Sequence, residues 1–448
     1  MRSVVKIYAL FLGSALLMFG GGLQGLLLSV RGAEESFSLV ALGLIGTGWS
    51  VGFIAGSIGV PLIVRKVGHI RAFSVMAAIG TITILLNLLW INDVGWIVLR
   101  ALSGFCFAGA AMIVESWLNE VSDNRNRGTI FSIYVTINMS ASTIGQLAMS
   151  ITGTAGYLPF VIGAISFICA LLPTALTSSP QPKPLASARL DIGLLYRTSP
   201  VAAIAALSCG MANGAFGTLA PVYGYQQGLD AGGIAVLFAT AAILGAVAQI
   251  PAGRLSDHID RRLVLIGLAG SAALVGTLTL IVNPAAGILM YVLFAAYGFA
   301  ANPLYAVAVA HANDFARDGD FAKVAGGMLL FLGVGLAIGP ALASVLMSVF
   351  GPVALFMVTV TFHGALAVAA WLRMRVRKSV DAAERAPFQP VSDRPTTLES
   401  VVLDPRTEPE PEDVSEAEPE VESALSDVTG TGPQEADNEG ESDVQDRN

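Results

Sequence analysis

Apolar runs of roughly twenty residues recur along most of this chain, and a run of that length is what an α-helix needs to cross a bilayer. Hydrophobic residues make up 54% of the 448 residues, and the mean hydropathy is +0.68. Membrane β-barrels would show shorter segments of alternating hydrophobicity, so we predict an all-α membrane protein. Breaking the chain at charged and Pro/Gly-rich positions gives twelve spans, approximately at residues 6–30, 37–64, 70–91, 95–118, 128–151, 156–176, 200–226, 231–254, 262–283, 286–311, 323–349 and 352–374.

The longest connection between spans divides them into two groups of six. This connection contains Pro180, Pro182 and Pro184. We therefore predict an N-terminal half and a C-terminal half joined by a linker, and the predicted boundaries are 1–176, 177–199 and 200–378.

A tail of opposite charge follows the predicted spans. Residues 1–378 contain 21 Lys and Arg against 13 Asp and Glu, whereas residues 379–448 contain 4 against 20, so the net charge of -8 combines +8 with -16. The tail is rich in Pro and Ser and poor in aromatic residues, and such a segment cannot bury enough apolar surface to fold. We predict a disordered, acidic, cytoplasmic tail.

The basic residues fix an expected orientation. With the N-terminus in the cytoplasm, the inner segments hold 19 of the 21 basic residues of the membrane part, which leaves Arg31 in an outer loop and Arg100 inside a span. A miscounted helix in the middle of the chain would destroy this pattern. We therefore predict twelve transmembrane helices with both termini in the cytoplasm, in a multi-pass protein of the bacterial inner membrane.

The two halves also suggest an internal repeat. An offset of 194 residues pairs Gly20 with Gly214, Gly59 with Gly253, Gly104 with Gly298, and Gly145 with Gly339. Glycine is so abundant that about three such matches are expected by chance. Stronger support is that this single offset keeps spans two, four and five in step with spans eight, ten and eleven. We predict two pseudo-symmetric halves that arose by a strongly diverged duplication.

Charge is concentrated at Gly253–Arg262, whose sequence GRLSDHIDRR stands between two predicted spans. Gly253 would let two helices approach closely, and Asp257 would suit a helix N-terminus. Arg261 and Arg262 could pair with acids on neighbouring helices. A simpler interpretation is a positively charged turn that only fixes topology.

The corresponding segment of the first half runs from Gly59 to Arg71. Its acid is missing, because Ile63 stands where the offset requires Asp. Arg65 and Arg71 are then expected to find acids elsewhere.

Three motifs resemble one known family. The pattern G-x-L-x-D-x-x-x-R-R of Gly253–Arg262, and Arg100 followed at four residues by Gly104, resemble loop and fourth-helix patterns of major facilitator superfamily transporters. The sequence ESWLNE from Glu115, followed by RNRG up to Gly128, resembles the YcaD-like group of bacterial permeases. The resemblance implies that the Gly253–Arg262 loop latches the two halves on the cytoplasmic side. It also implies that spans one, four, seven and ten line a central cavity.

Several polar and aromatic residues on those spans are therefore candidates for the substrate cavity and for coupling. The alternative for each amide is a hydrogen bond between helices, which is a commoner role than contact with a ligand. The candidates are Gln24, Arg100, Asn213, Tyr223, Asn302 and Tyr305, with Phe107, Phe216 and Tyr297 as aromatic walls.

Arg100 and Glu115 share one face of the fourth span at different depths. Fifteen residues separate them, which is roughly 22 Å along a helix, so they cannot pair directly. An intramembrane arginine faces a cavity or a partner, and two interpretations stay open for Arg100, an anionic substrate group and a structural role. We expect Glu115 to take part in a gate, paired with Arg65, Arg71 or Arg127.

These expectations define a function. We predict a secondary active transporter of a small neutral or amphiphilic organic solute, working by alternating access, with proton-coupled efflux as the preferred form. The expected partners are the lipid bilayer, the substrate and protons, without nucleic acid, cofactor or metal, and the protein is expected to act as a monomer. The alternative is a non-transporting sensor or scaffold that recruits a partner through its acidic tail. An enzyme is disfavoured, because the chain shows no catalytic triad, metal cluster or carboxylate dyad.

Overall fold

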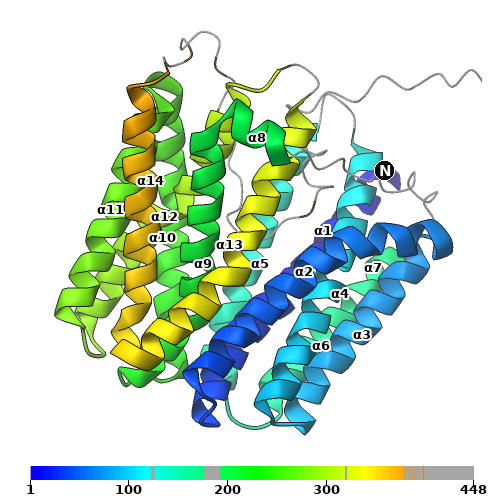
Figure 1. Ribbon diagram of the computed structural model, residues 1–448. Coiled ribbons are helices and arrows are strands. Elements are labelled where there is room, and N and C mark those ends of the chain that lie inside the picture. The colour runs from blue at the N-terminus through cyan, green and yellow to red at the C-terminus, as the bar shows by residue number, and fades with distance from the viewer. Residues whose placement is uncertain are drawn as a thin grey trace, which may run out of the picture. The chain divides into compact units, whose positions relative to one another are not determined.

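The chain is described by a computed structural model that covers residues 2–122, 127–175, 192–317 and 320–377, together with Val380, Arg385, Phe388 and Thr397. All regular elements in these ranges are helices (Figure 1). The helices are α1 (Arg2–Glu34), α2 (Leu39–Val67), α3 (His69–Leu89), α4 (Asp93–Val121), α5 (Arg127–Thr152), α6 (Leu158–Cys169), α7 (Leu171–Ala175), α8 (Ile192–Thr198), α9 (Pro200–Gln226), α10 (Ala231–His258), α11 (Arg261–Val282), α12 (Ile288–Asn313), α13 (Phe321–Phe350) and α14 (Leu355–Met374), with a 3₁₀ turn η1 (Pro352–Ala354) before α14.

Ten of these helices are long and apolar enough to cross a membrane. The predicted span 156–176 is divided into α6 and the short α7, and α6 has 12 residues. Helix α5 has 26 residues, but it is not one of the ten. The prediction of an all-helical, multi-pass membrane protein is confirmed.

Part of the predicted linker is helical. It forms α8, where the buried side chain of Leu195 packs against Gly327 of α13. The apolar sequence IGLLY explains this packing. Residues 176–191, and most of the tail, lie outside the described residues.

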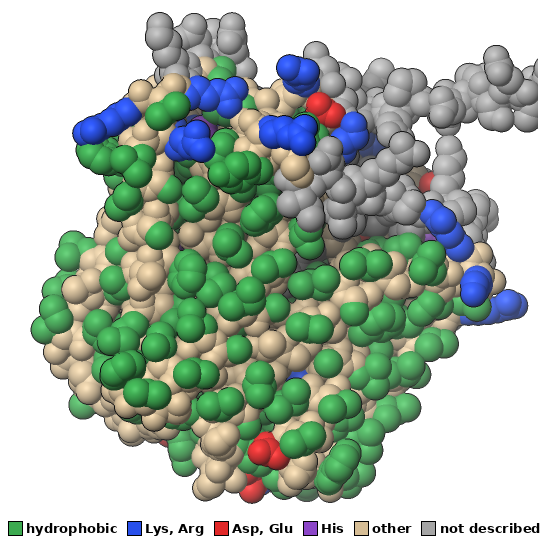
Figure 2. Space-filling model, in the orientation of Figure 1, with side chains coloured by type: hydrophobic (Ala, Val, Ile, Leu, Met, Phe, Trp, Pro, Cys, Tyr) green, Lys and Arg blue, Asp and Glu red, His purple; other side chains and the backbone are tan. Residues whose placement is uncertain are grey.

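The helices run alternately between two faces. We call the face on which α1 begins and α14 ends the terminal face, which is the upper side in Figure 1. Helices α2, α4, α10 and α12 end at this same face, and α3, α5, α11 and α13 begin there. Figure 2 shows Lys and Arg side chains gathered along it, whereas hydrophobic side chains cover the flank of the helices. This distribution is typical of a protein whose flank meets lipid.

Short polar side chains begin several helices. Ser38, Asn92 and Asp230 accept hydrogen bonds from backbone N–H groups in the first turns of α2, α4 and α10. On the terminal face, Gly68 joins α2 to α3 with a φ of 82°, a conformation that other residues rarely adopt. These capping side chains and this glycine determine where the helices begin and where the chain turns.

Glycines bring helices of each half into close contact at equivalent places. A Cβ at Gly104 of α4 would overlap the backbone of α2, and a Cβ at Gly298 of α12 would overlap that of α10. Likewise, Gly145 of α5 touches α1, and Gly339 of α13 touches α9. These are the glycine pairs of the 194-residue offset, so the matches correspond to shared contacts and support the predicted repeat.

The two halves touch through α2 and α13 in the part of these helices remote from the terminal face. Thr47 donates a hydrogen bond of 2.7 Å to the carbonyl of Ala337, and Ser50 donates one of 3.1 Å to the carbonyl of Leu336. Gly43 lies directly against Ser344, where any Cβ would overlap the serine side chain. The two helices separate toward the terminal face (Figure 1).

Candidate functional site

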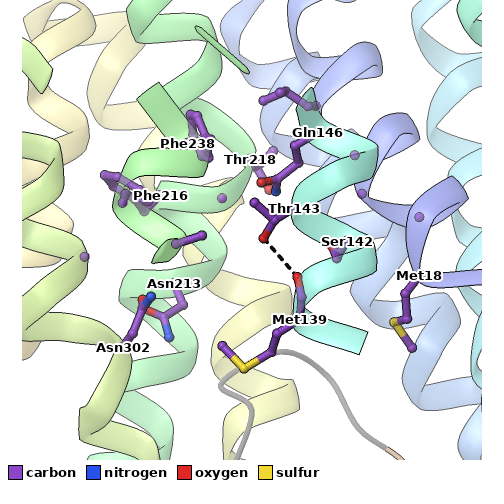
Figure 3. A pocket seen from close by; sticks show the side chains of 18 of the residues that line it. Met18, Met139, Ser142, Thr143, Gln146, Asn213, Phe216, Thr218, Phe238 and Asn302 are labelled. Carbon is purple, nitrogen blue, oxygen red and sulfur yellow. Dashed lines mark hydrogen bonds between the residues drawn. The ribbon is translucent and has the colours of Figure 1, made fainter. Parts of the chain in front are cut away.

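A cavity of about 580 Å³ lies between the two halves, near the middle of the helices (Figure 3). It is lined by residues of α1, α2, α4 and α5 from one half and of α9, α10, α12 and α13 from the other. The predicted cavity residues that line it are Arg100, Phe107, Asn213, Phe216, Tyr297 and Asn302. A site to which both halves contribute can change when the halves move relative to each other.

Arg100 carries the charge of this cavity. Its guanidinium donates a hydrogen bond of 3.0 Å to Oε1 of Gln24 and lies 5.6 Å from the ring centre of Trp49. Ser103 also donates to Oε1 of Gln24, at 3.3 Å. Within the described ranges Arg100 has no carboxylate partner. Gln24 thus holds the guanidinium in place without neutralising it.

Two amide groups near the cavity leave a polar atom without a hydrogen-bond partner among the described residues. These atoms are Nε2 of Gln24, which is beside Arg100, and Oε1 of Gln146 on α5. Buried polar atoms normally have partners, so an unmatched donor and acceptor at a cavity suit a polar ligand. Asn213 and Asn302 lie next to each other on the opposite wall (Figure 3).

Aromatic side chains cover much of the remaining wall. In the first half the rings of Trp49 and Phe107 lie 5.7 Å apart. In the second half Phe216 stacks on Tyr297 at 4.5 Å and packs against Phe238 at 5.7 Å. Rings from both halves therefore offer apolar surface to a bound molecule.

Three predicted cavity residues do not line it, and one of them, Gln24, instead holds Arg100. Tyr223 is buried near the far end of α9, where its hydroxyl donates to Asn283 at 3.1 Å. Tyr305 is buried within the apolar cluster of the second half. The position of each tyrosine along or around its helix directs the side chain into the packing between helices and away from the cavity.

Helix α5 also contributes to the cavity, although it was not among the spans expected there. Met139, Ser142, Thr143 and Gln146 line the cavity from this helix, and Figure 3 shows Met139, Thr143 and Gln146 along one side of it. Their spacing of three and four residues is that of a single helical face. This polar stripe was visible in the sequence, and it also explains the lower hydropathy of α5.

Charged residues of the α10–α11 connection form a compact group on the terminal face. Arg261 is buried and pairs with Asp314 at 3.0 Å, and it also lies 3.6 Å from Asp257. Arg262 pairs with Asp260 at 2.6 Å and donates to the carbonyl of Arg377 at 2.7 Å.

One detail of the predicted loop is corrected. Asp257 does not begin a helix, because α10 continues to His258 and places Asp257 in its last turn. Asp260 caps α11 instead, by accepting a hydrogen bond from the backbone N–H of Arg262.

The other predicted gating residues are dispersed over the terminal side. Gly59 packs under the ring of Phe105, and Arg65 and Arg71 are exposed. Arg127 is half-buried at the start of α5. Glu115 is 1% exposed and accepts a hydrogen bond of 2.7 Å from the hydroxyl of Tyr134. It accepts another from the hydroxyl of Thr397, a residue of the C-terminal segment.

Metal ligands are not clustered: the described residues contain no group of three or more His, Cys, Asp or Glu side chains that could hold a metal ion.

The fold and the cavity together define a multi-pass membrane protein with a solute-sized site between two helical halves. Comparison with known proteins gives the family. The Major Facilitator Superfamily profile matches residues 10–245 and 202–409, which together cover most of the chain. The chain belongs to this superfamily and is a membrane transporter of the secondary class rather than an enzyme.

Relatives and solved structures agree with this assignment. The chain is 25% identical over 328 residues to the MFS-type transporter YcaD of Escherichia fergusonii, and the match covers 72% of this chain and 84% of YcaD. The fold is similar to that of the nucleoside transporter NupG, with a TM-score of 0.67, 14% identity and coverage of 85% of this chain and 100% of NupG. It is also similar to a bacterial homologue of the lysosomal transporter Spinster, with a TM-score of 0.64, 16% identity and coverage of 85% and 97%.

Proposed function

We propose that this protein transports a small organic solute that has an apolar body and one anionic group. The observation that carries the proposal is the environment of Arg100, a cationic side chain at a cavity between the halves with no carboxylate partner among the described residues. A buried charge is costly unless it is compensated. A carboxylate or similar group of the solute would compensate it.

The rest of the cavity supports the same class of solute. Gln146 lines the cavity, and its Oε1 has no hydrogen-bond partner among the described residues. The rings of Trp49, Phe107 and Phe216 provide apolar surface for the body of the molecule. A neutral solute would use the amides and rings without the charge.

The proposed mechanism is alternating access of a twelve-helix bundle with both termini in the cytoplasm. The basic residues on the terminal face support this orientation (Figure 2). The contacts of Thr47 and Ser50 with α13 hold the halves together in the part of these helices remote from the terminal face. A cavity closed on that side would receive solute from the cytoplasm, which is the loading state that the proposed export requires.

A proton gradient is the proposed energy source. Glu115 supports it, because its buried carboxyl group lies between the cavity and the terminal face and is bonded to the hydroxyl of Tyr134. Solute uptake into inside-out vesicles should then stop when a protonophore collapses the gradient. Uptake that persists without a proton gradient would contradict this coupling.

A ligand-stabilisation screen tests the substrate class most directly. The purified protein would be melted with aromatic monocarboxylates, with the corresponding neutral amides, and with nucleosides, since NupG is a nucleoside transporter of similar fold. We expect stabilisation by the monocarboxylates. Arg100→Gln should weaken their binding roughly tenfold or more, because a hydrogen bond to a charged group is lost. Arg71→Gln, at an exposed arginine, is the matched control. Equal binding by both variants would remove Arg100 from the site.

A further inference from the structure

The wall of the cavity between α5 and α10 contains side chains that are also on the surface of the protein. Helix α5 of the first half packs against α10 of the second. At the ends remote from the terminal face they touch, since a Cβ at Gly232 would lie 3.8 Å from the Cβ of Ser150. Closer to the middle of the helices, Ile144 and Ile243 line the cavity, yet their side chains are 57% and 54% exposed.

The pattern of exposed residues on α10 shows which way Ile243 faces. Val236 stands seven residues before Ile243 and Ile250 seven residues after it, so the three lie on one line along the helix. Val236 and Ile250 are exposed, and neither lines the cavity. Their line therefore faces the flank of the protein, and Ile243 borders the cavity from that flank.

Helix α5 has the same arrangement. Ile133 and Ile151 stand eleven residues before and seven residues after Ile144, which places them on the same side of the helix. Both are exposed, and both lie outside the cavity. Ile144 thus also borders the cavity from the flank.

Small side chains stand beside the two isoleucines. Ser140 of α5 and Ala246 of α10 are each about one turn nearer the terminal face, and both are exposed and line the cavity. We call the gap bordered by Ser140, Ile144, Ile243 and Ala246 the flank opening. Through it the cavity reaches the outer surface of the helices.

The flank opening lies at the depth of the hydrocarbon layer. Ile144 is seventeen residues from the start of α5 and eight from its end, which is roughly 26 Å and 12 Å along the helix. Ile243 is twelve residues from the start of α10 and fifteen from its end, roughly 18 Å and 22 Å. Because the hydrocarbon core of a bilayer is about 30 Å thick, lipid chains surround both residues.

The same cavity holds the guanidinium of Arg100, so it offers two different environments. One is a cation without a carboxylate partner in the described part of the chain, and the other is an apolar gap that meets lipid. A molecule with an anionic head and a hydrocarbon chain matches both. Its head would be compensated by Arg100, and its chain would stay out of water.

We propose that the flank opening receives the hydrocarbon chain of an anionic single-chain amphiphile. The head group binds at Arg100, and the chain passes between α5 and α10 into the lipid. The volume of the cavity then does not limit the length of the chain. The assignment of the head group rests on the proposed function, whereas the flank opening does not.

Cysteine labelling tests the opening without requiring transport. The reporter is Thr143→Cys, at a position that lines the cavity, in a chain whose native Cys106, Cys169 and Cys209 are replaced by Ala. The protein in phosphatidylcholine nanodiscs is treated with one of two methanethiosulfonates. One has a dodecyl chain and partitions into lipid, and the other has a trimethylammonium group and stays in water.

Filling the gap should affect only the reagent that arrives from lipid. Ala246→Trp should slow labelling by the dodecyl reagent roughly tenfold, which corresponds to a barrier about 1.4 kcal/mol higher, and should leave labelling by the charged reagent unchanged. Val247→Trp is the matched control, because Val247 is the next residue of α10, is exposed and does not line the cavity. Ile144→Trp fills the gap from α5 and decides the matter if Ala246→Trp does not fold.

The path of the chain is tested by protection of the same cysteine. Octanoate and dodecanoate are added before the charged reagent. Dodecanoate should protect Thr143→Cys at a lower concentration than octanoate does, because more apolar surface leaves water. Ala246→Trp should abolish this difference, since the longer chain then has no way out of the cavity.

Unchanged labelling by the dodecyl reagent in both Ala246→Trp and Ile144→Trp would overturn the flank opening. Equal slowing of the two reagents would also overturn it, because both would then enter by one path. So would a Val247→Trp protein as slow as Ala246→Trp. If the dodecyl labelling changes as expected but neither carboxylate protects the cysteine, the opening stands and the anionic solute of the proposed function falls. If octanoate protects while the dodecyl labelling does not change, the proposed function stands without the opening.

Discussion

Each half has an equivalent connection between two helices at the terminal face, α2–α3 in the first half and α10–α11 in the second. The two connections are stabilised differently. In the α10–α11 connection, Arg261 is buried and pairs with Asp314 and Asp257. In the α2–α3 connection, the offset of 194 residues places Ile63 where the second half has Asp257, and Ile63 packs against the apolar cluster that contains Val60 and Val64. The same turn can therefore be fixed by buried charges or by apolar packing. The charged version also binds the C-terminal segment.

The largest effect is expected at the buried ion pair. Arg261→Met should lower the free energy of unfolding by about 3–5 kcal/mol, because it leaves Asp314, whose side chain is 4% exposed, without its charge partner. Thermal and denaturant unfolding of the purified protein would measure this loss. Arg71→Met, at an exposed arginine of the first half, should change stability by no more than about 0.5 kcal/mol.

A second variant identifies the cause. Replacing both partners, as Arg261→Met with Asp314→Leu, should recover most of the stability, since two apolar side chains can substitute for a buried ion pair. If Arg261→Met were no more harmful than Arg71→Met, the contrast between the two halves would be lost.

The next prediction restores the missing acid of the first half. Ile63→Asp should destabilise the protein by about 1–3 kcal/mol, because Ile63 is half-buried among apolar side chains and a carboxylate there would lose hydration. Ile63→Leu keeps the volume and is the control, and its cost should be below about 1.5 kcal/mol. An Ile63→Asp protein as stable as the wild type would show that the first half still accepts a charged latch.

The equivalent glycines of the two connections provide a smaller contrast. A Cβ at Gly59 would lie 3.3 Å from the ring of Phe105, so a slight shift accommodates it, and Gly59→Ala should add up to about 0.5–1 kcal/mol of helix stability. A Cβ at Gly253 would overlap the ring of Phe388, so Gly253→Ala should displace that ring. Gly253→Ala should therefore lower the melting temperature of the purified protein, whereas Gly59→Ala should not. Equal melting temperatures of the two variants would show that Phe388 does not need this space.

The helices could be predicted from the sequence because hydrophobic length depends on local composition. The predicted spans differ from α2, α9 and α10 by only a few residues at either end. Arg100, Asn213 and Asn302 could be expected at the cavity, since polar residues inside apolar spans have few other places to lie. It is harder to predict which side of a long apolar helix faces the cavity. For this reason Tyr223 and Tyr305 were expected at the cavity, although they lie elsewhere.

The features that the sequence analysis missed depend on contacts between distant segments. Gln146 was overlooked because the cavity was assigned to four spans by resemblance, although the polar face of α5 was already visible in the sequence. The contact between Glu115 and Thr397 joins residues 282 positions apart in the chain. Composition describes the average behaviour of the acidic tail, and it gives no information on one threonine that finds a buried carboxylate.

The smallest expected effect is on the pH dependence of stability. It again differs between the α10–α11 and α2–α3 connections. Burial raises the pKa of Asp260, but the hydrogen bonds and charge of Arg262 outweigh this effect, so the pKa lies below its usual value of 3.8. A lowered pKa in the folded state means that the stabilisation is present above pH 3.8 and is lost as the pH falls through the folded-state value. Lys66 occupies the equivalent position of the first half, where no carboxylate stands. The melting temperature measured from about pH 6 to about pH 3 should therefore fall less in Asp260→Asn than in the wild type, whereas Lys66→Gln should keep the wild-type slope. Identical slopes for all three proteins would mean that the pair of Asp260 and Arg262 adds no stability to the turn.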